Sequence, residues 1–130
     1  MSYIVATVGR MGNVDAFVAA QDTIKRVATD FGATTVRASQ TIIGGEAQGN
    51  VQVAFETETI DTAMALGSGM TKSVEIRDMM GAAEGSVLRR SLMRKMASRG
   101  EMKGKFVSGL MLKSDPVSPE QHDANMDHAW

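Results

Sequence analysis

The sequence lacks cysteine and contains only two histidines, His122 and His128. Without cysteine, disulfide bonds, thiolate catalysis, cysteine-ligated zinc and iron–sulfur clusters are all excluded. No apolar run approaches the roughly 20 residues that a membrane-spanning helix requires. The first six residues also lack the basic patch and the long apolar stretch of a signal peptide. We therefore expect a cytoplasmic protein without a membrane partner.

An excess of charge of either sign is missing as well. The chain has 14 Lys and Arg residues against 15 Asp and Glu residues, for a formal net charge of −1. With no long basic run, the protein has no field that attracts nucleic acid. The exposed positions of one predicted strand, Gln52, Ala54 and Glu56, include none of the aromatic side chains that an RNA-recognition module stacks on bases. We expect no nucleic-acid partner.

At 130 residues the chain has the length of a single domain, and its clearest local pattern is a β-hairpin. Residues 34–43 and 50–58 alternate apolar and polar side chains, and a glycine-rich segment, 44–49, joins them. The sequence before the hairpin predicts a strand over 3–8 and a helix over 14–31. More helix and a late strand follow, so the predicted order is βαββαβ.

Several residues mark where the helices begin and end. Asn13 is a suitable N-cap for the first helix, and Gly32 lies where a C-terminal glycine belongs. Thr59 is a suitable N-cap for the second helix. The segment 67–69, Gly-Ser-Gly, predicts an interruption, because glycine costs about 1 kcal/mol relative to alanine inside a helix. We expect the helix to restart near Ser73.

The sequence of residues 84–98 is compatible with either a helix or a strand. Their apolar positions follow a helical stripe, and as a strand they would place Arg90 and Arg94 on an apolar face. We therefore favour a helix here and a last strand over 105–112. In the alternative, residues 86–97 are the fourth strand and 105–112 are an appended strand that pairs with a partner subunit.

The expected domain covers residues 1–112, and residues 113–130 are expected to form a flexible tail, because their composition is polar and proline-containing. This tail holds the one group of metal-ligating residue types in the sequence. A solvated tail is the favoured explanation for them, because the composition of the segment is polar, so we expect no metal. The four residues are His122, Asp123, Asp127 and His128.

Side chains alternate across a sheet, so the hairpin has one apolar and one polar face. The apolar face must lie under the helices. If Ile43 pairs with Asn50 across the turn, Arg37 falls opposite Glu56 at a distance suited to an ion pair. The first strand adds either Ile4, Ala6 and Val8 or Tyr3, Val5 and Thr7 to the polar face. That face otherwise carries Arg37, Ser39, Thr41, Gln52 and Glu56.

The βαββαβ order, the small size and the half-polar sheet face resemble the dimeric α/β-barrel superfamily of ferredoxin-like α+β fold, which includes antibiotic-biosynthesis-monooxygenase-like proteins. The resemblance covers roughly residues 3–112. It implies a homodimer whose two antiparallel sheets meet face to face, with a small-molecule pocket inside the barrel or between sheet and helices. Haem-degrading members rely on a core histidine or tryptophan, but here the one tryptophan is Trp130. We therefore expect no cofactor.

The polar face supplies the candidate site. Arg37 is predicted to hold a carboxylate or enolate oxygen, and Glu56 to act as a general base if burial raises its pKa. An ordinary cross-strand ion pair is the alternative role for these two residues. Arg10 and Arg77 are expected near a pocket mouth. The remaining candidates for ligand binding are Tyr3, Ser39, Thr41 and Gln52.

Three functions fit this description: a protein that binds a small organic ligand, a cofactor-independent monooxygenase or isomerase, and a structural dimer with a solid core. The first two require a cavity with convergent polar groups. The third requires that aliphatic and methionine side chains fill it. Because the predicted core contains neither histidine nor cysteine, we favour ligand binding and leave the reaction undefined.

Overall fold

A computed structural model of the chain describes residues 2–101, 103–111, 115, 118, 120, 121 and 124. The chain divides into two compact units, the first ending at Lys95 and the second beginning at Met96. The sheet and the helices that pack on it belong to the first unit. In the second unit, residues 96–101 and 103–111 carry no helix or strand.

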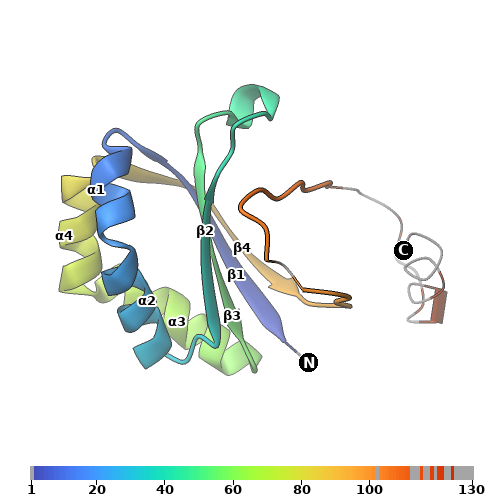
Figure 1. Cartoon of the computed structure of the whole chain (residues 1–130). Helices are drawn as coiled ribbons and strands as arrows, with labels where there is room; N and C mark the ends of the chain where they lie inside the picture. Colours follow the sequence, from blue (N-terminus) through green and yellow to red (C-terminus); the bar gives the residue numbers. More distant parts are fainter. Residues whose placement is uncertain are drawn as a thin grey trace. The chain divides into compact units, whose positions relative to one another are not determined.

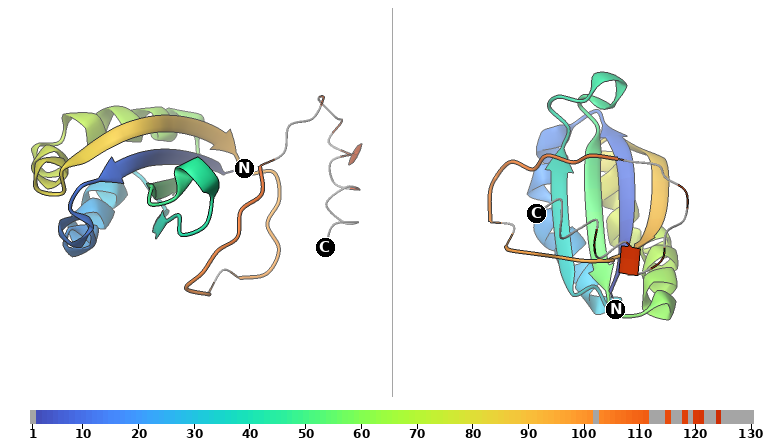
Figure 2. Two further views of the ribbon diagram at one scale, coloured as in Figure 1. Left: turned by 90° about the horizontal axis from the view of Figure 1, so that it is seen from above. Right: turned by 90° about the vertical axis from the view of Figure 1, so that its right-hand side faces the viewer.

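The first unit is a four-stranded antiparallel sheet covered by helices on one face (Figure 1). The strand order is β2-β3-β1-β4, and the view from above shows the helical layer and the sheet separately (Figure 2). This is the predicted ferredoxin-like βαββαβ fold, with two helices in each crossover. The elements are β1 (Tyr3–Met11), α1 (Val14–Ala19), α2 (Gln21–Asp30), β2 (Thr35–Gln40), the short helix η1 (Gly45–Ala47), β3 (Val51–Thr57), α3 (Ile60–Lys72), α4 (Val74–Ala82) and β4 (Gly85–Arg94).

The hydrophobic core lies between the helices and the sheet. Alternate residues of β1 and β3 point into it, and they meet one apolar stripe of each helix. The buried residue Thr57 donates its hydroxyl proton to the carbonyl oxygen of Thr59 at 3.0 Å, so this polar group is satisfied. The main core residues are Val5, Phe17, Ile24, Val27, Val51, Val53, Phe55 and Leu66.

The helix boundaries follow the predicted caps. The side chains of Asn13, Thr59 and Ser73 accept hydrogen bonds from the backbone three residues ahead. The predicted interruption at 67–69 is wrong, because α3 continues to Lys72. The ring of Phe31 occupies the space at Gly69, where a Cβ atom would lie 2.5 Å from a ring carbon. This close approach explains a glycine that helix propensity alone disfavours.

The predicted helix over 84–98 is also wrong, and the alternative of a fourth strand is confirmed. Residues Gly85–Arg94 form β4, which pairs with β1 from Met11 back to Tyr3. A pairing irregularity between Val8 and Gly9 leaves Leu88 unmatched. As an edge strand β4 keeps Arg90 and Arg94 exposed, so arginines on that face do not have to be buried.

Residues 105–111 form no strand, which corrects the predicted last strand; Leu112 lies outside the described residues. Most of the predicted tail over 113–130 lies outside them too, including the four residues considered for a metal. Among the residues that the structure does describe, no group of three or more His, Cys, Asp or Glu side chains could hold a metal ion. None of the described helices is both long and apolar enough to cross a membrane.

The hairpin pairs two residues away from the predicted register. Thr41, not Ile43, bonds with Asn50: the Thr41 amide donates to the Asn50 carbonyl at 2.9 Å. The longer loop makes room for η1 and closes at Gly49, whose φ of 88° favours glycine. As a result Glu56 faces Thr35, and Arg37 faces Ala54.

Candidate functional site

The sheet face opposite the helices, called the open face below, carries most of the predicted site residues. Since Val5 and Phe55 point into the core, their neighbours on β1 and β3 point the other way. The first of the two alternatives for the first strand is therefore correct. Looking onto this face, Figure 2 shows the strands side by side in the order β2, β3, β1 and β4. The residues on the open face include Ile4, Ala6, Val8, Arg37, Ser39, Gln52, Ala54 and Glu56.

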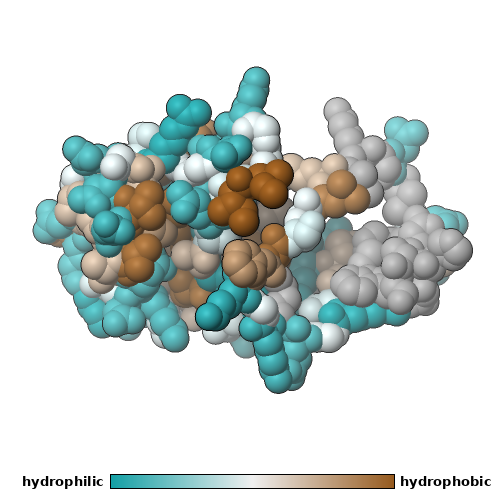
Figure 3. Space-filling model, turned by 45° about the horizontal axis from the view of Figure 1, so that its top comes forward, coloured by the Kyte–Doolittle hydropathy of each residue, from teal (hydrophilic) through white to brown (hydrophobic). Residues whose placement is uncertain are grey.

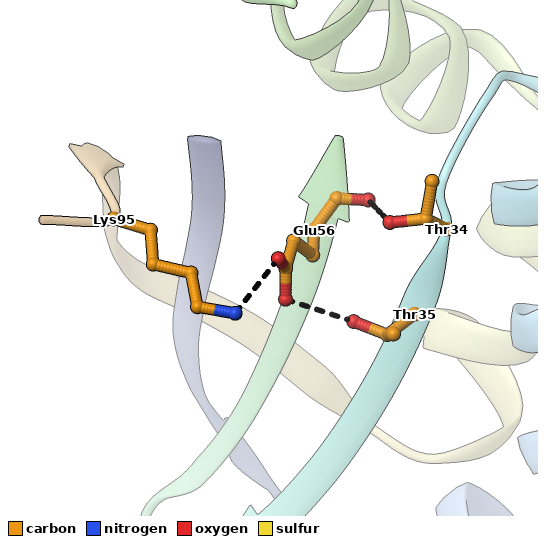
Figure 4. A network of polar contacts seen from close by, with 4 residues as sticks. All are labelled: Thr34, Thr35, Glu56 and Lys95. Atoms are coloured by element: carbon orange, nitrogen blue, oxygen red, sulfur yellow. Dashed lines mark hydrogen bonds and ion pairs between the residues drawn. The ribbon is translucent and has the colours of Figure 1, made fainter. Parts of the chain in front are cut away.

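Glu56 is the centre of a polar network on the open face (Figure 4). Its carboxylate accepts a hydrogen bond from Lys95 Nζ at 3.1 Å and one from the Thr35 hydroxyl at 3.4 Å. Lys95 itself is fixed by a backbone bond to the carbonyl of Ser2 at 2.9 Å. The network joins β2, β3 and the end of β4.

The pKa of Glu56 moves opposite to what a general base requires. Desolvation alone would raise it, but the hydrogen bond and the charge of Lys95, with hydrogen bonds from Ser2 and Thr35, outweigh desolvation and lower the pKa below its ordinary value. A carboxylate that is held ionised by a lysine is a weak base. The expectation of a raised pKa is therefore wrong, and the arrangement favours a structural ion pair.

The other predicted residues are dispersed. Within the described part of the chain, the exposed side chain of Arg37 makes no hydrogen bond or ion pair, so the predicted pair with Glu56 is not formed. Ser39 and Gln52 face each other across β2 and β3. Thr41 lies just beyond β2, where its backbone closes the loop. Tyr3 lies on the helix side and packs against the core.

A cavity of about 280 Å³ lies on the helix side of the sheet. The helices α1 to α4 and the strands β1, β3 and β4 all contribute to its wall, and the wall is mainly apolar. None of the six predicted site residues lines it; Ser39 lines a second cavity of about 260 Å³ beside α1 and β2. The apolar wall of the larger cavity includes Phe17, Ile24, Val53, Phe55, Met70, Met79 and Met80.

The polar part of this cavity wall is built around Thr71, in the last turn of α3. Arg90 of β4 donates a hydrogen bond from Nη1 to the Thr71 hydroxyl at 2.8 Å, and that hydroxyl donates to the carbonyl of Gly67 at 2.9 Å. Arg77 of α4 donates from Nε to the Thr71 carbonyl at 3.3 Å. Thr71, Arg77 and Arg90 are exposed, so the two guanidinium groups lie where the cavity opens.

Arg77 thus lines a pocket as expected, whereas Arg10 does not line this one and bonds to Asn50 at 3.4 Å instead. Sequence reasoning missed Arg90 and Thr71. The signal for Arg90 was present, because a strand over 86–97 places it on the same face as apolar residues of β4. Nothing local distinguishes Thr71 from other threonines in helices.

Apolar side chains also reach the surface away from the cavity, and Figure 3 shows hydrophobic residues in separate places among hydrophilic ones. In the first unit the most exposed are Ile43, Val74 and Met64, at 90%, 68% and 63%. They belong to a loop, α4 and α3.

No family model and no curated protein matches this chain. Solved structures do match it. A NIPSNAP-like domain protein from Burkholderia xenovorans aligns with a TM-score of 0.53 and 8% identity, over 78% of this chain and 90% of that one. A candidate antibiotic biosynthesis monooxygenase from Chloroflexus aurantiacus J-10-fl aligns with a TM-score of 0.50 and 11% identity, over 77% and 98%.

A dimeric ferredoxin-like protein from an uncultured marine organism also aligns, with a TM-score of 0.50 and 13% identity, over 71% of this chain and 94% of that one. At such identities the likeness concerns the fold. It supports the predicted ferredoxin-like α+β fold. What the chain does must therefore be argued from its own residues.

Proposed function

We propose that this protein binds a small organic ligand in the cavity between the helices and the sheet. The observation that carries the proposal is the cavity itself: about 280 Å³, with an apolar wall and a few convergent polar groups at its opening. Binding sites for small molecules have this composition, because apolar contacts supply affinity and a few polar groups fix orientation.

Binding is favoured over acid–base catalysis by the residue types that surround the cavity. Among the described residues that line it there is no histidine, cysteine or carboxylate. The half-buried carboxylate Glu56 lies on the open face and has a lowered pKa. A general base poised near neutral pH is thus missing from this wall.

We further propose that two copies pack their open faces together. This face combines apolar residues with the Glu56–Lys95 pair, and no helix of the first unit covers it (Figure 1). The similar marine protein is described as dimeric. In such a dimer Arg37, Ser39, Gln52 and Glu56 would line the interface, which keeps them as candidates for contact with the second subunit or with a ligand.

Methionine methyl groups offer a direct test of the cavity. Met70, Met79 and Met80 line it, whereas Met64 is 63% exposed on α3 and Met93 pairs with Ile4 on the open face. In protein with 13C-labelled methionine methyls, a neutral aromatic probe, naphthalene-2-carboxamide, should shift the resonances of the three cavity methionines.

The signals of Met64 and Met93 serve as controls in the same spectrum and should stay in place. Shifts confined to Met93 would move the site to the open face. A titration that leaves all of the cavity methionines unshifted at millimolar probe would overturn the proposal.

A further inference from the structure

We infer that the ligand carries an anionic oxygen group, such as a carboxylate, and that Arg77 and Arg90 receive it at the opening of the cavity. This inference rests on the proposed function and adds the chemical class of the ligand. Thr71 acts as a positioning residue, since it fixes one atom of each guanidinium group.

The hydrogen bonds to Thr71 leave donors of both arginines available. Arg90 uses Nη1 for the Thr71 hydroxyl, which leaves Nη2 and Nε. Arg77 uses Nε for the Thr71 carbonyl, which leaves both terminal nitrogens. Each side chain therefore retains the paired N–H groups that bind a carboxylate. Because Thr71 bonds to both, the two forks are held close to one point.

The charges of these two arginines are not compensated within the described part of the chain. Neither Arg77 nor Arg90 forms an ion pair there, whereas Arg26 on α2 pairs with Glu75 on α4. Two cations anchored to one threonine repel each other, and a bound anion removes that repulsion. The end of α3 adds only the partial negative charge of its carbonyl groups.

The apolar wall defines the rest of the ligand. An inorganic anion would satisfy the two arginines but leave the space beside Phe17, Phe55 and Met70 without favourable contacts. An organic acid with an aromatic or alicyclic body satisfies both parts of the site. The class is thus an amphipathic acid, with its body inside and its charge at the opening.

Two probes of nearly equal shape separate this inference from the proposed function. Naphthalene-2-carboxylate and naphthalene-2-carboxamide differ in charge but not in their ring system. We expect the carboxylate to bind about tenfold or more tightly, as measured by calorimetry at low ionic strength, because charge-assisted hydrogen bonds replace neutral ones. This preference, the ratio of the carboxylate affinity to the carboxamide affinity, should fall to near one in the double variant Arg77→Met, Arg90→Met.

Arg89→Met is the matched control, because Arg89 is the next residue on β4 but pairs with Val8 on the open face. It should keep the full preference. In the double variant the carboxamide should still shift the methyl resonances of Met70, Met79 and Met80, which shows that the cavity is intact.

The outcomes are distinguishable. If both probes shift the cavity methionines with equal affinity, or if the double variant keeps the preference, the inference is wrong and the proposed function stands. If neither probe shifts them, both fail. If Thr71→Val lowers the preference while the carboxamide still shifts the cavity methionines, the positioning role of Thr71 is supported, and an unchanged preference contradicts that role.

Discussion

Lys95 and Glu56 form an ion pair across the open face: Lys95 Nζ lies 3.1 Å from Glu56 Oε1, although 39 residues separate them in the chain. The two residues lie on opposite sides of β1. Ile4 of β1 pairs with Glu56 on one side and with Met93, two residues before Lys95, on the other. The pair therefore ties the end of β4 to β3, over the strand between them.

This relationship predicts how stability depends on pH. Because the folded-state pKa of Glu56 is lowered below its ordinary value, its ionised form contributes stability at neutral pH, and that contribution is lost as the pH falls through the folded-state pKa. We expect Glu56→Gln to lower the free energy of unfolding by about 1 kcal/mol at pH 7. The difference from wild type should shrink as the pH is lowered from 7 to 3.

Urea unfolding at the two pH values measures this difference. Glu46→Gln, in the exposed loop at η1, is the control and should have little effect at either pH. A Glu56→Gln penalty of equal size at pH 7 and pH 3 would show that the ion pair is not its cause.

Two isoleucines test the position of the core with the same substitution. Ile24 on α2 is 2% exposed and Ile43 in the hairpin loop is 90% exposed. We expect Ile24→Ala to lower the free energy of unfolding by about 2–5 kcal/mol, because it removes buried methyl groups and leaves a cavity. Ile43→Ala should change it by less than about 0.5 kcal/mol. Chemical denaturation measures both, and similar losses would contradict the described burial.

Two glycines should respond to alanine in opposite directions. Gly32 has a φ of 102°, and a Cβ there would lie 2.5 Å from a methyl group of Thr62. Gly32→Ala should therefore destabilise the protein by about 1–3 kcal/mol. Gly67, inside α3, has no atom within 4 Å of the added Cβ, so Gly67→Ala should stabilise by up to about 1 kcal/mol. Thermal unfolding compares the two, and a stabilising Gly32→Ala would refute the positive φ.

The fold was predictable because its signals are local. Asn13, Thr59 and Ser73 cap helices through residues only three positions ahead, and the hairpin strands alternate over their own length. The exceptions depend on distant partners. Gly69 is tolerated in α3 because the ring of Phe31 fills the space beside it. Residues 85–94 form a strand because they pair with the edge of β1 that β3 does not occupy.

The candidate site was harder to predict, because a two-residue register shift changes every cross-strand pair. The loop around η1 takes Ile42 and Ile43 out of the strand, and Arg37 then faces Ala54 instead of Glu56. The actual partner of Glu56, Lys95, lies within the segment 84–98 that was predicted as a helix. Likewise, Thr71 and Arg90 meet only when α3 and β4 are packed together, so no spacing in the sequence reveals the rim of the cavity.

Ala54 offers a test of the proposed dimer. It lies on the open face of β3, opposite Ala6 of β1 and Arg37 of β2. If a second copy covers this face, Ala54→Arg adds an unpaired cation to each side of a two-fold interface, which costs several kcal/mol when the charge is buried. We expect sedimentation at micromolar concentration to give a dimer mass for wild type and a monomer mass for the variant. Ala65→Arg, on the exposed surface of α3, should remain dimeric. A wild-type monomer under these conditions, or a dimeric Ala54→Arg variant, would show that the open face is not the interface.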